Sequence, residues 1–267
     1  MFSAGFNTKN EISMEDHIEK VAQMIMEAKK VAVFTGAGVS TESGISDFRS
    51  PDGIWSRYDP EDFTIQRFVS DKDARKRNWQ FRKELVSADY KPNPAHFAVA
   101  ELEKLGKLSC VITQNIDGLH HAAGNSEEKI VELHGTIKYA KCLECDDRLL
   151  LVDVLKRIED GEEDPHCKKC DGLLKAATIS FGEAMPIDEM NRSEQCSKAC
   201  DLFIVIGSSL VVFPAANMPV LAKRAGASLV IINYTSTDMD SMADVVIHEK
   251  AGIAMNAIID KIKQNLS

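Results

Sequence analysis

Four cysteines form the clearest chemical pattern in the sequence: Cys142, Cys145, Cys167 and Cys170, spaced Cys-x2-Cys-x21-Cys-x2-Cys. A two-residue gap lets both thiolates of a pair face one ion, and four sulfurs complete a closed tetrahedral zinc site. A redox pair is the alternative, but two such pairs in one polar stretch favour a metal. Because a closed site leaves no coordination position for water, the spacing predicts one structural zinc per chain.

A glycine-rich turn follows a short apolar run in VAVFTGAGVSTESG, residues 31–44. Glycines between a strand and a helix let backbone N–H groups approach a pyrophosphate. The spacing departs from Gly-x-Gly-x-x-Gly because Thr41 follows Ser40, so the turn alone fits a dinucleotide site and an ordinary turn equally well. GSSL (207–210) and Asn233 each end another apolar run, where open parallel sheets bind ligands, and Asn233 could hydrogen-bond an adenosine ribose.

Apolar runs and amphipathic stretches alternate along most of the chain. Strands are expected at 31–36, 107–115, 129–135, 201–207, 228–233 and 244–248, and helices at 14–29, 72–87, 95–106, 214–226 and 252–265. This alternation predicts an α/β fold, a Rossmann-like parallel sheet with helices on both faces. The cysteine-rich stretch interrupts it and is expected to be a small inserted module around a short helix near 150–159. Residues 44–60 are rich in Gly, Pro, Asp and Ser, and predict a long loop.

Composition restricts the classes of function. The 267 residues suffice for one large domain or a large and a small one. The net charge of −9 argues against nonspecific nucleic-acid binding as the main activity, and we expect no specific nucleic-acid partner; it would suit cationic partners such as lysine-rich peptides. No apolar run reaches the roughly 18 residues of a membrane span. Seven cysteines without an evident export signal indicate a reducing compartment, so we expect a cytoplasmic protein without membrane association.

Several stretches in a fixed order resemble the sirtuin family of NAD-dependent protein deacylases. They are GAGVSTESGISDFRS (36–50), TQNIDGLH (113–120), ELHG (132–135) and the paired cysteines, extended by FGE (181–183) and GSSLVVFPAA (207–216). The resemblance covers the chain from about Met14 to its end. It implies transfer of an acyl group, with acetyl expected, from a protein or peptide lysine to NAD, releasing nicotinamide and O-acyl-ADP-ribose. The alternative is an ADP-ribosyltransferase or NAD glycohydrolase that uses the same NAD site.

The resemblance also implies a domain division. Residues 14–135 and 176–267 would form the NAD-binding Rossmann-like domain, within which 44–92 would include the cofactor loop and the helical part of a small domain. Residues 136–175 would form the zinc-binding module.

His134 matches the family's general base, and Asn115 is expected to be catalytic beside it. A histidine has the intrinsic pKa to take a proton from a ribose hydroxyl near neutral pH. Asn115 and Asp117 match residues that bind the nicotinamide ribose and carboxamide. Burying such polar residues is costly unless they meet a polar ligand. The alternatives are a structural histidine at a strand end and an Asx turn at Asp117.

Other matched positions imply the rest of the NAD site. They are Gly36, Ala37, Gly38, Ser40, Thr41, Asp47, Phe48, Arg49, Gln114, Asn115, Ile116, Asp117, Gly207, Ser208, Ser209, Asn233, Tyr234 and Ala251. Phe48 would shield the reactive anomeric carbon from water and Arg49 would reach phosphate, although a surface ion pair is the alternative for Arg49. The family usually has proline where this chain has Ser46, which leaves the loop freer, and often has proline at Ala176.

The resemblance also implies an apolar channel for the acyl-lysine. Its expected residues are Phe48, Trp79, Arg82, Ile116, Phe181, Gly182, Val211 and Val212, although ordinary core packing is the alternative for the apolar ones. An extended peptide would add as a strand between FGE and the loop after GSSL. Sirtuins that remove acidic acyl groups carry Tyr-x-x-Arg here, whereas this chain has Trp79 with Arg82. Neutral acyl groups are therefore expected, and Trp79 could line a longer-chain pocket.

Overall fold

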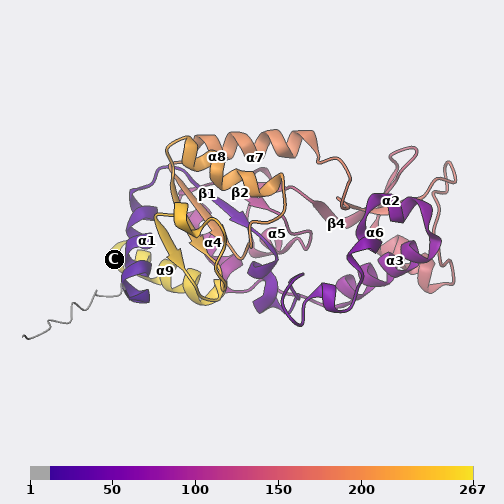
Figure 1. Ribbon diagram of the computed structural model, residues 1–267, viewed down its shortest axis with the longest axis horizontal. Helices are drawn as coiled ribbons and strands as arrows, with labels where there is room; N and C mark the ends of the chain where they lie inside the picture. The colour runs from indigo at the N-terminus through magenta and orange to yellow at the C-terminus, as the bar shows by residue number, and fades with distance from the viewer. Residues whose placement is uncertain (1–12, 267) are drawn as a thin grey trace, which may run out of the picture.

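The computed structural model describes residues 13–266, and a six-stranded parallel sheet forms its centre (Figure 1). The strand order is β3-β2-β1-β7-β8-β9. The strands are β1 (Val31–Thr35), β2 (Leu108–Thr113), β3 (Ile130–Glu132), β7 (Leu202–Ile206), β8 (Ser228–Ile232) and β9 (Val245–Ile247). Every residue of β1 and β7 is buried, as expected for parallel strands covered on both faces.

Helices cover both faces of this sheet. One face packs against α1 (Met14–Glu27), α4 (Pro94–Lys104) and α9 (Ala251–Leu266). The opposite face packs against α7 (Ile187–Ala199) and α8 (Met218–Arg224), which lie together above the sheet in Figure 1. Neighbouring residues of β1 therefore enter different cores: Val31 and Val33 face the first set of helices, and Ala32 and Phe34 face the second.

The strand order reverses between β1 and β7. From β1 the chain builds the sheet outward through β2 and β3, and it returns to the other side of β1 to add β7, β8 and β9. Open α/β sheets bind their ligands outside the carboxyl ends of the strands at such a switch point. The polar segments after β1, β2 and β7 meet there.

A smaller part of the molecule lies beyond this edge of the sheet, at the right of Figure 1. Its antiparallel sheet has the order β5-β4-β6, formed by β4 (Gly135–Cys142), β5 (Arg148–Leu150) and β6 (Leu174–Thr178). Its helices are α2 (Ile65–Ser70), α3 (Lys72–Ser87) and α6 (Leu151–Glu159). A short helix, α5 (Leu119–Ala123), packs against α4 on the larger part.

The predicted parallel sheet with an inserted cysteine-rich module is confirmed. Several elements differ from the sequence expectations: α2, α5 and the three strands of the small sheet were not predicted. The stretch 214–226 is a 3-10 turn, Ala215–Asn217, followed by the short helix α8, and α7 was not predicted. Among residues 13–266 we find no helix both long and apolar enough to span a bilayer.

Candidate active site

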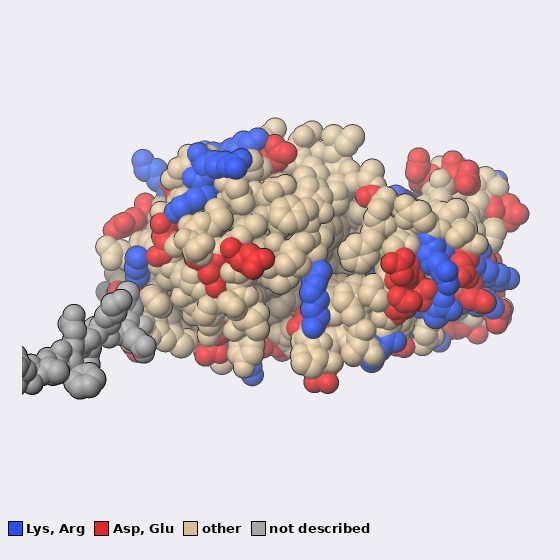
Figure 2. Space-filling view, in the orientation of Figure 1, with Lys and Arg blue, Asp and Glu red and all other residues tan. Residues whose placement is uncertain are grey.

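A cavity of about 980 Å³ lies between the large sheet and the smaller part, where the surface in Figure 2 is hollowed. It is lined by segments that follow β1, β2, β7 and β8, together with the loop 44–55 and residues 178–183. All the residues predicted to bind NAD line this one cavity, and so do His134 and every predicted substrate residue except Trp79. The structure therefore brings together residues from widely separated parts of the sequence.

Gly36 and Gly38, which follow β1, lie so close to another backbone segment that a side chain would not fit there. Gly38 donates its N–H to the carbonyl of Gly207 at 2.8 Å, and Gly36 donates to Ile206 at 3.2 Å. A Cβ at Gly36 or at Gly38 would lie 2.8 Å from the Gly207 carbonyl oxygen. The turn after β1 therefore packs directly on the turn after β7. It continues as a 3-10 helix, Ala37–Ser43, with its backbone at the cavity wall.

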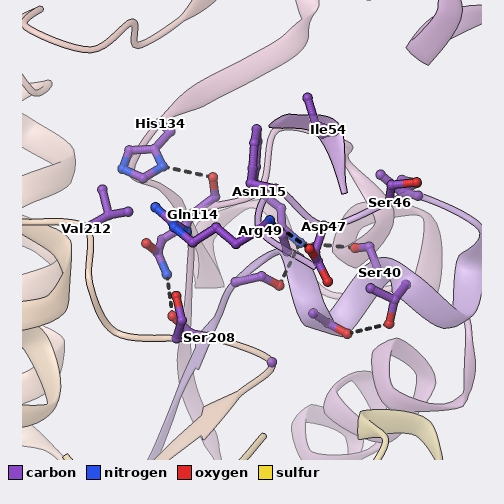
Figure 3. Close-up of a pocket in the computed structure, with 18 of the residues that line it drawn as sticks. Ser40, Ser46, Asp47, Arg49, Ile54, Gln114, Asn115, His134, Ser208 and Val212 are labelled. Carbon is purple, nitrogen blue, oxygen red and sulfur yellow. Dashed lines mark hydrogen bonds between the residues drawn. The ribbon is translucent and has the colours of Figure 1, made fainter. Parts of the chain in front are cut away.

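Ser40 is the centre of a buried polar network. Asn115 donates from Nδ2 to the Ser40 hydroxyl at 3.0 Å and to the Gly36 carbonyl at 3.2 Å. The Ser40 hydroxyl in turn donates to Asp117 at 2.8 Å. Figure 3 shows Ser40 and Asn115 beside Gln114, whose side chain donates to the Ser208 hydroxyl at 2.9 Å. The asparagine amide is thus held in one orientation at the cavity wall.

His134 follows β3 and is oriented by one backbone contact. Its Nδ1 lies 3.0 Å from the Gln114 carbonyl oxygen, which can only accept (Figure 3). The neutral imidazole must therefore carry its proton on Nδ1, which leaves Nε2 as a proton acceptor. Burial lowers the pKa of His134, and the Gln114 contact partly offsets this shift. The imidazole is therefore neutral at physiological pH, as a general base must be.

The loop that carries Asp47, Phe48 and Arg49 is ordered by its own hydrogen bonds. The Asp47 carboxylate accepts from the backbone N–H groups of Arg49 at 2.9 Å and Ser50 at 2.7 Å. The Asp47 carbonyl accepts from Ile54 at 2.8 Å. This Asx turn fixes the segment directly after Ser46, where the family usually has proline.

Aromatic rings form the wall of the cavity on the side of the smaller part. Trp55 lies 5.1 Å from Phe48 and 6.1 Å from Phe181, measured between ring centroids. Trp55 lines the cavity without having been predicted from the sequence, and so do several other residues, namely Ile54, Phe63, Phe81, Leu85 and Met185. The cluster of aromatic residues within 48–63 was the available signal. Glycine, proline and aspartate dominate that stretch, so its composition predicts a loop and not an aromatic wall.

The expectation that Trp79 lines the acyl channel is not supported by its position. Its side chain is 2% exposed and packs with Leu151, Val154 and Leu174 between α3 and the cysteine-rich module. Arg82, one helical turn later, does line the cavity. Residues three apart on a helix are offset by about 60°. On α3 that offset places Trp79 in the core and Arg82 at the cavity wall.

The four cysteines converge at the far end of the smaller part. Their sulfur atoms all lie within 4.8 Å of one another, and the Cys142–Cys170 and Cys145–Cys167 sulfurs are 3.5 and 3.7 Å apart. Tetrahedral zinc with Zn–S bonds of about 2.3 Å requires sulfur separations of about 3.8 Å. The donor set therefore fits one structural zinc ion, away from the cavity.

The amino-acid sequence is similar to that of known proteins over most of its length. The Sir2 family model matches residues 36–214. NAD-dependent protein deacetylase 1 of Bradyrhizobium diazoefficiens is 49% identical over 244 residues, covering 91% of this chain and 95% of that protein. NAD-dependent protein deacylase 2 of Archaeoglobus fulgidus is 41% identical over 257 residues, covering 94% and 98%.

Solved structures agree with the sequence comparison. A structure from work on the mechanism and regulation of Sir2 enzymes matches with a TM-score of 0.86 at 41% identity, covering 94% of this chain and 99% of that one. A Sir2–p53 peptide–NAD+ complex matches with a TM-score of 0.84 at 33% identity and the same coverage.

Proposed function

The chain belongs to the Sir2 family, and from this premise we propose that it is an NAD-dependent protein-lysine deacylase with acetyl-lysine as its main substrate group. The observation that carries the proposal is the single cavity that gathers His134, Asn115 and the glycine-rich turn. Such a reaction breaks the bond between nicotinamide and ribose and the bond between the acyl group and lysine. The acyl group moves from the lysine nitrogen to ADP-ribose, one water molecule is consumed, and free lysine and nicotinamide are released.

Different residues at the cavity would bind the parts of NAD and accept the proton. The Ser40–Asn115–Asp117 network would bind the nicotinamide ribose and carboxamide, because it presents oriented amide and carboxylate groups at the cavity wall. Nε2 of His134 would accept the proton of a ribose hydroxyl, so that its oxygen can receive the acyl group. The backbone of the turn after β1 would face the phosphates, where N–H groups favour anions.

The other predicted residues would surround these groups. Gly207, Ser208, Ser209, Asn233, Tyr234 and Ala251 would complete the adenosine side, and Phe48 would exclude water from the reacting carbon. An extended peptide would lie between Phe181 and Val211, which are 45% and 47% exposed at the cavity. Backbone pairing of this kind gives loose sequence preference.

Two further assignments belong to the proposal. The domain division would assign 14–135 and 176–267 to the NAD-binding domain, with 44–92 including the cofactor loop and the helical part of the small domain, and 136–175 to the zinc-binding module. The protein would act in the cytoplasm, because a four-thiolate zinc site needs reduced cysteines and none of the seven cysteines is in a disulfide. Membranes and nucleic acids are not expected partners.

Mass spectrometry of products formed from NAD and a panel of acyl-lysine peptides tests the proposal. We expect deacylated peptide, nicotinamide and O-acyl-ADP-ribose in equal amounts. Nicotinamide release that is independent of the acyl peptide would instead favour the NAD glycohydrolase, and ADP-ribose attached to protein would favour the transferase.

A further inference from the structure

A buried ion pair lies beneath the segment on which the peptide is proposed to dock. Lys175, in β6, is 2% exposed, and its ammonium lies 2.8 Å from the Glu183 carboxylate. The same ammonium donates to the carbonyl of Thr178. Lys141, on the neighbouring strand β4, contacts the other Glu183 oxygen at 3.2 Å. One carboxylate thus joins two of the three strands of the small sheet, β4 and β6, to the segment after β6.

Glu183 also determines the local shape of that segment. Its carboxylate accepts from the backbone N–H of Ser180 at 2.9 Å, and its own N–H donates to the Ser180 carbonyl at 3.0 Å. These two bonds close a turn in which Gly182 has φ +76°. Before the turn, Ile179 donates its N–H to the carbonyl of His134 at 2.9 Å. The segment 179–183 is therefore anchored at one end by the backbone of His134 and at the other end by the Glu183 side chain.

The charges around Glu183 are not balanced. Besides Lys175 and Lys141, the Arg82 guanidinium is buried nearby and donates to the Thr178 hydroxyl at 3.1 Å, and its Nε has no partner among the described residues. Burial lowers the pKa of Lys175 to about 8, Glu183 opposes that shift, and Arg82 and Lys141 add to it. Loss of the single carboxylate would leave three neighbouring cations to repel one another.

We infer that Glu183 and Lys175 are positioning residues for the acyl-lysine peptide: their ion pair holds the segment 179–183 in the form that the peptide backbone requires. Neither side chain needs to touch NAD. This inference rests on the proposed deacylase function and adds a residue pair that governs peptide affinity apart from NAD affinity.

Steady-state kinetics of Glu183→Gln and Lys175→Met test the inference. Each substitution should raise KM for an acetyl-lysine peptide about tenfold or more, because it removes one partner of a charged hydrogen bond, whereas KM for NAD should change less than about twofold. Removing both partners is less harmful than leaving one buried charge. The double variant should therefore raise the peptide KM by less than the product of the two single effects. Lys175→Arg, which keeps the charge, should recover most of the affinity.

The pH dependence supplies a readout that a merely structural contact would not change. Lys175 loses its proton as pH rises through about 8, so the wild-type peptide KM should rise above that pH. Lys175→Arg should remove this rise, because arginine stays charged. The peptide should carry only neutral residues beside the acetyl-lysine, so that its own charge is constant.

Lys83→Met is the matched control, since it breaks the exposed Lys83–Glu159 pair of the same small part, and it should leave both KM values unchanged. Equal changes in both KM values, or strictly multiplicative effects in the double variant, would overturn the inference. Wild-type protein without deacylation would instead refute the proposed function. If Glu183→Gln lost its thermal unfolding transition, the pH comparison of wild type with Lys175→Arg would decide.

Discussion

A single backbone carbonyl determines which ring nitrogen of the proposed base carries the proton. Because the Gln114 carbonyl holds the Nδ1 proton of His134, only Nε2 can accept a proton in the cavity. Gln114 also reaches Ser208 through its side chain, so the residue that orients the base also joins β2 to the turn after β7.

His134→Ala should therefore reduce deacylation by about 10²- to 10⁴-fold while NAD affinity is largely retained. Burial lowers the pKa of His134, so the neutral base persists to lower pH. The acid limb of kcat/KM should have its midpoint below the ordinary histidine value of about 6.5. Rate–pH profiles and NAD titration of both proteins would measure this, and near wild-type deacylation by the variant would exclude His134 as the base.

Trp79 leads to a different expectation, because it lies in the core and not at the cavity. The indole is part of the core between α3 and α6, so Trp79→Tyr should lower thermal stability by part of the roughly 3–5 kcal/mol that truncation to alanine costs. Activities toward acetyl-lysine and succinyl-lysine should fall together. Val69→Ala, at a half-exposed site on α2, is the stability control. An increase in activity toward succinyl-lysine alone would instead show that Trp79 lines the acyl pocket.

Among the elements, the strands of the large sheet were predictable because their apolar runs end at glycine or polar residues. α7 was not, because its buried face consists largely of small polar residues such as Ser193 and Ser197, whose hydroxyls bond to carbonyls of the preceding turn. The cysteine spacing predicted the metal cluster, because all its ligands lie in one stretch. The aromatic residues within 48–63 are visible in the sequence, but their packing against Phe81 of α3 is a long-range contact that no local pattern reveals.

A second buried ion pair joins two elements of the smaller part. Arg75, on α3, makes a bidentate contact with Asp164 at 2.8 and 2.8 Å, next to the cysteine-rich segment. Arg75→Met should cost about 3–5 kcal/mol in unfolding free energy, because it leaves a buried carboxylate unpaired. Zinc should also be lost faster to a chelator. Lys76→Met, which breaks the exposed Lys76–Glu163 pair between the same elements, should cost at most about 1 kcal/mol.

The Arg75 contact lowers the pKa of Asp164. The stability that the Arg75–Asp164 pair contributes is therefore present in full above the ordinary aspartate pKa of about 3.9. It is lost as pH falls through the lower pKa that Asp164 has in the folded protein. Thermal unfolding and zinc retention at neutral pH measure the full effect. Equal zinc loss from the Arg75 and Lys76 variants would show that the bidentate pair does not hold the module.

Over the whole molecule, 41 acidic residues outnumber 32 basic ones, which gives a net charge of −9. Figure 2 shows most charged side chains toward both ends of the visible face, with one basic side chain at the hollow and an acidic cluster beside it. We expect any preference for cationic peptides to arise chiefly from the long-range field of this net negative charge. Fields of this kind raise the local concentration of oppositely charged substrates.

Peptides that carry arginine beside the acetyl-lysine should accordingly show a lower KM than otherwise identical peptides with glutamate, by several-fold at low salt. The Debye length falls from about 10 Å at 0.1 M to about 3 Å at 1 M salt, so the KM ratio should approach one as salt increases. A glutamine-flanked peptide controls for general salt effects on the enzyme. A ratio that persists at high salt would point to direct ion pairs with the peptide, and equal KM values at low salt would show that the net charge of the protein has no part in substrate choice.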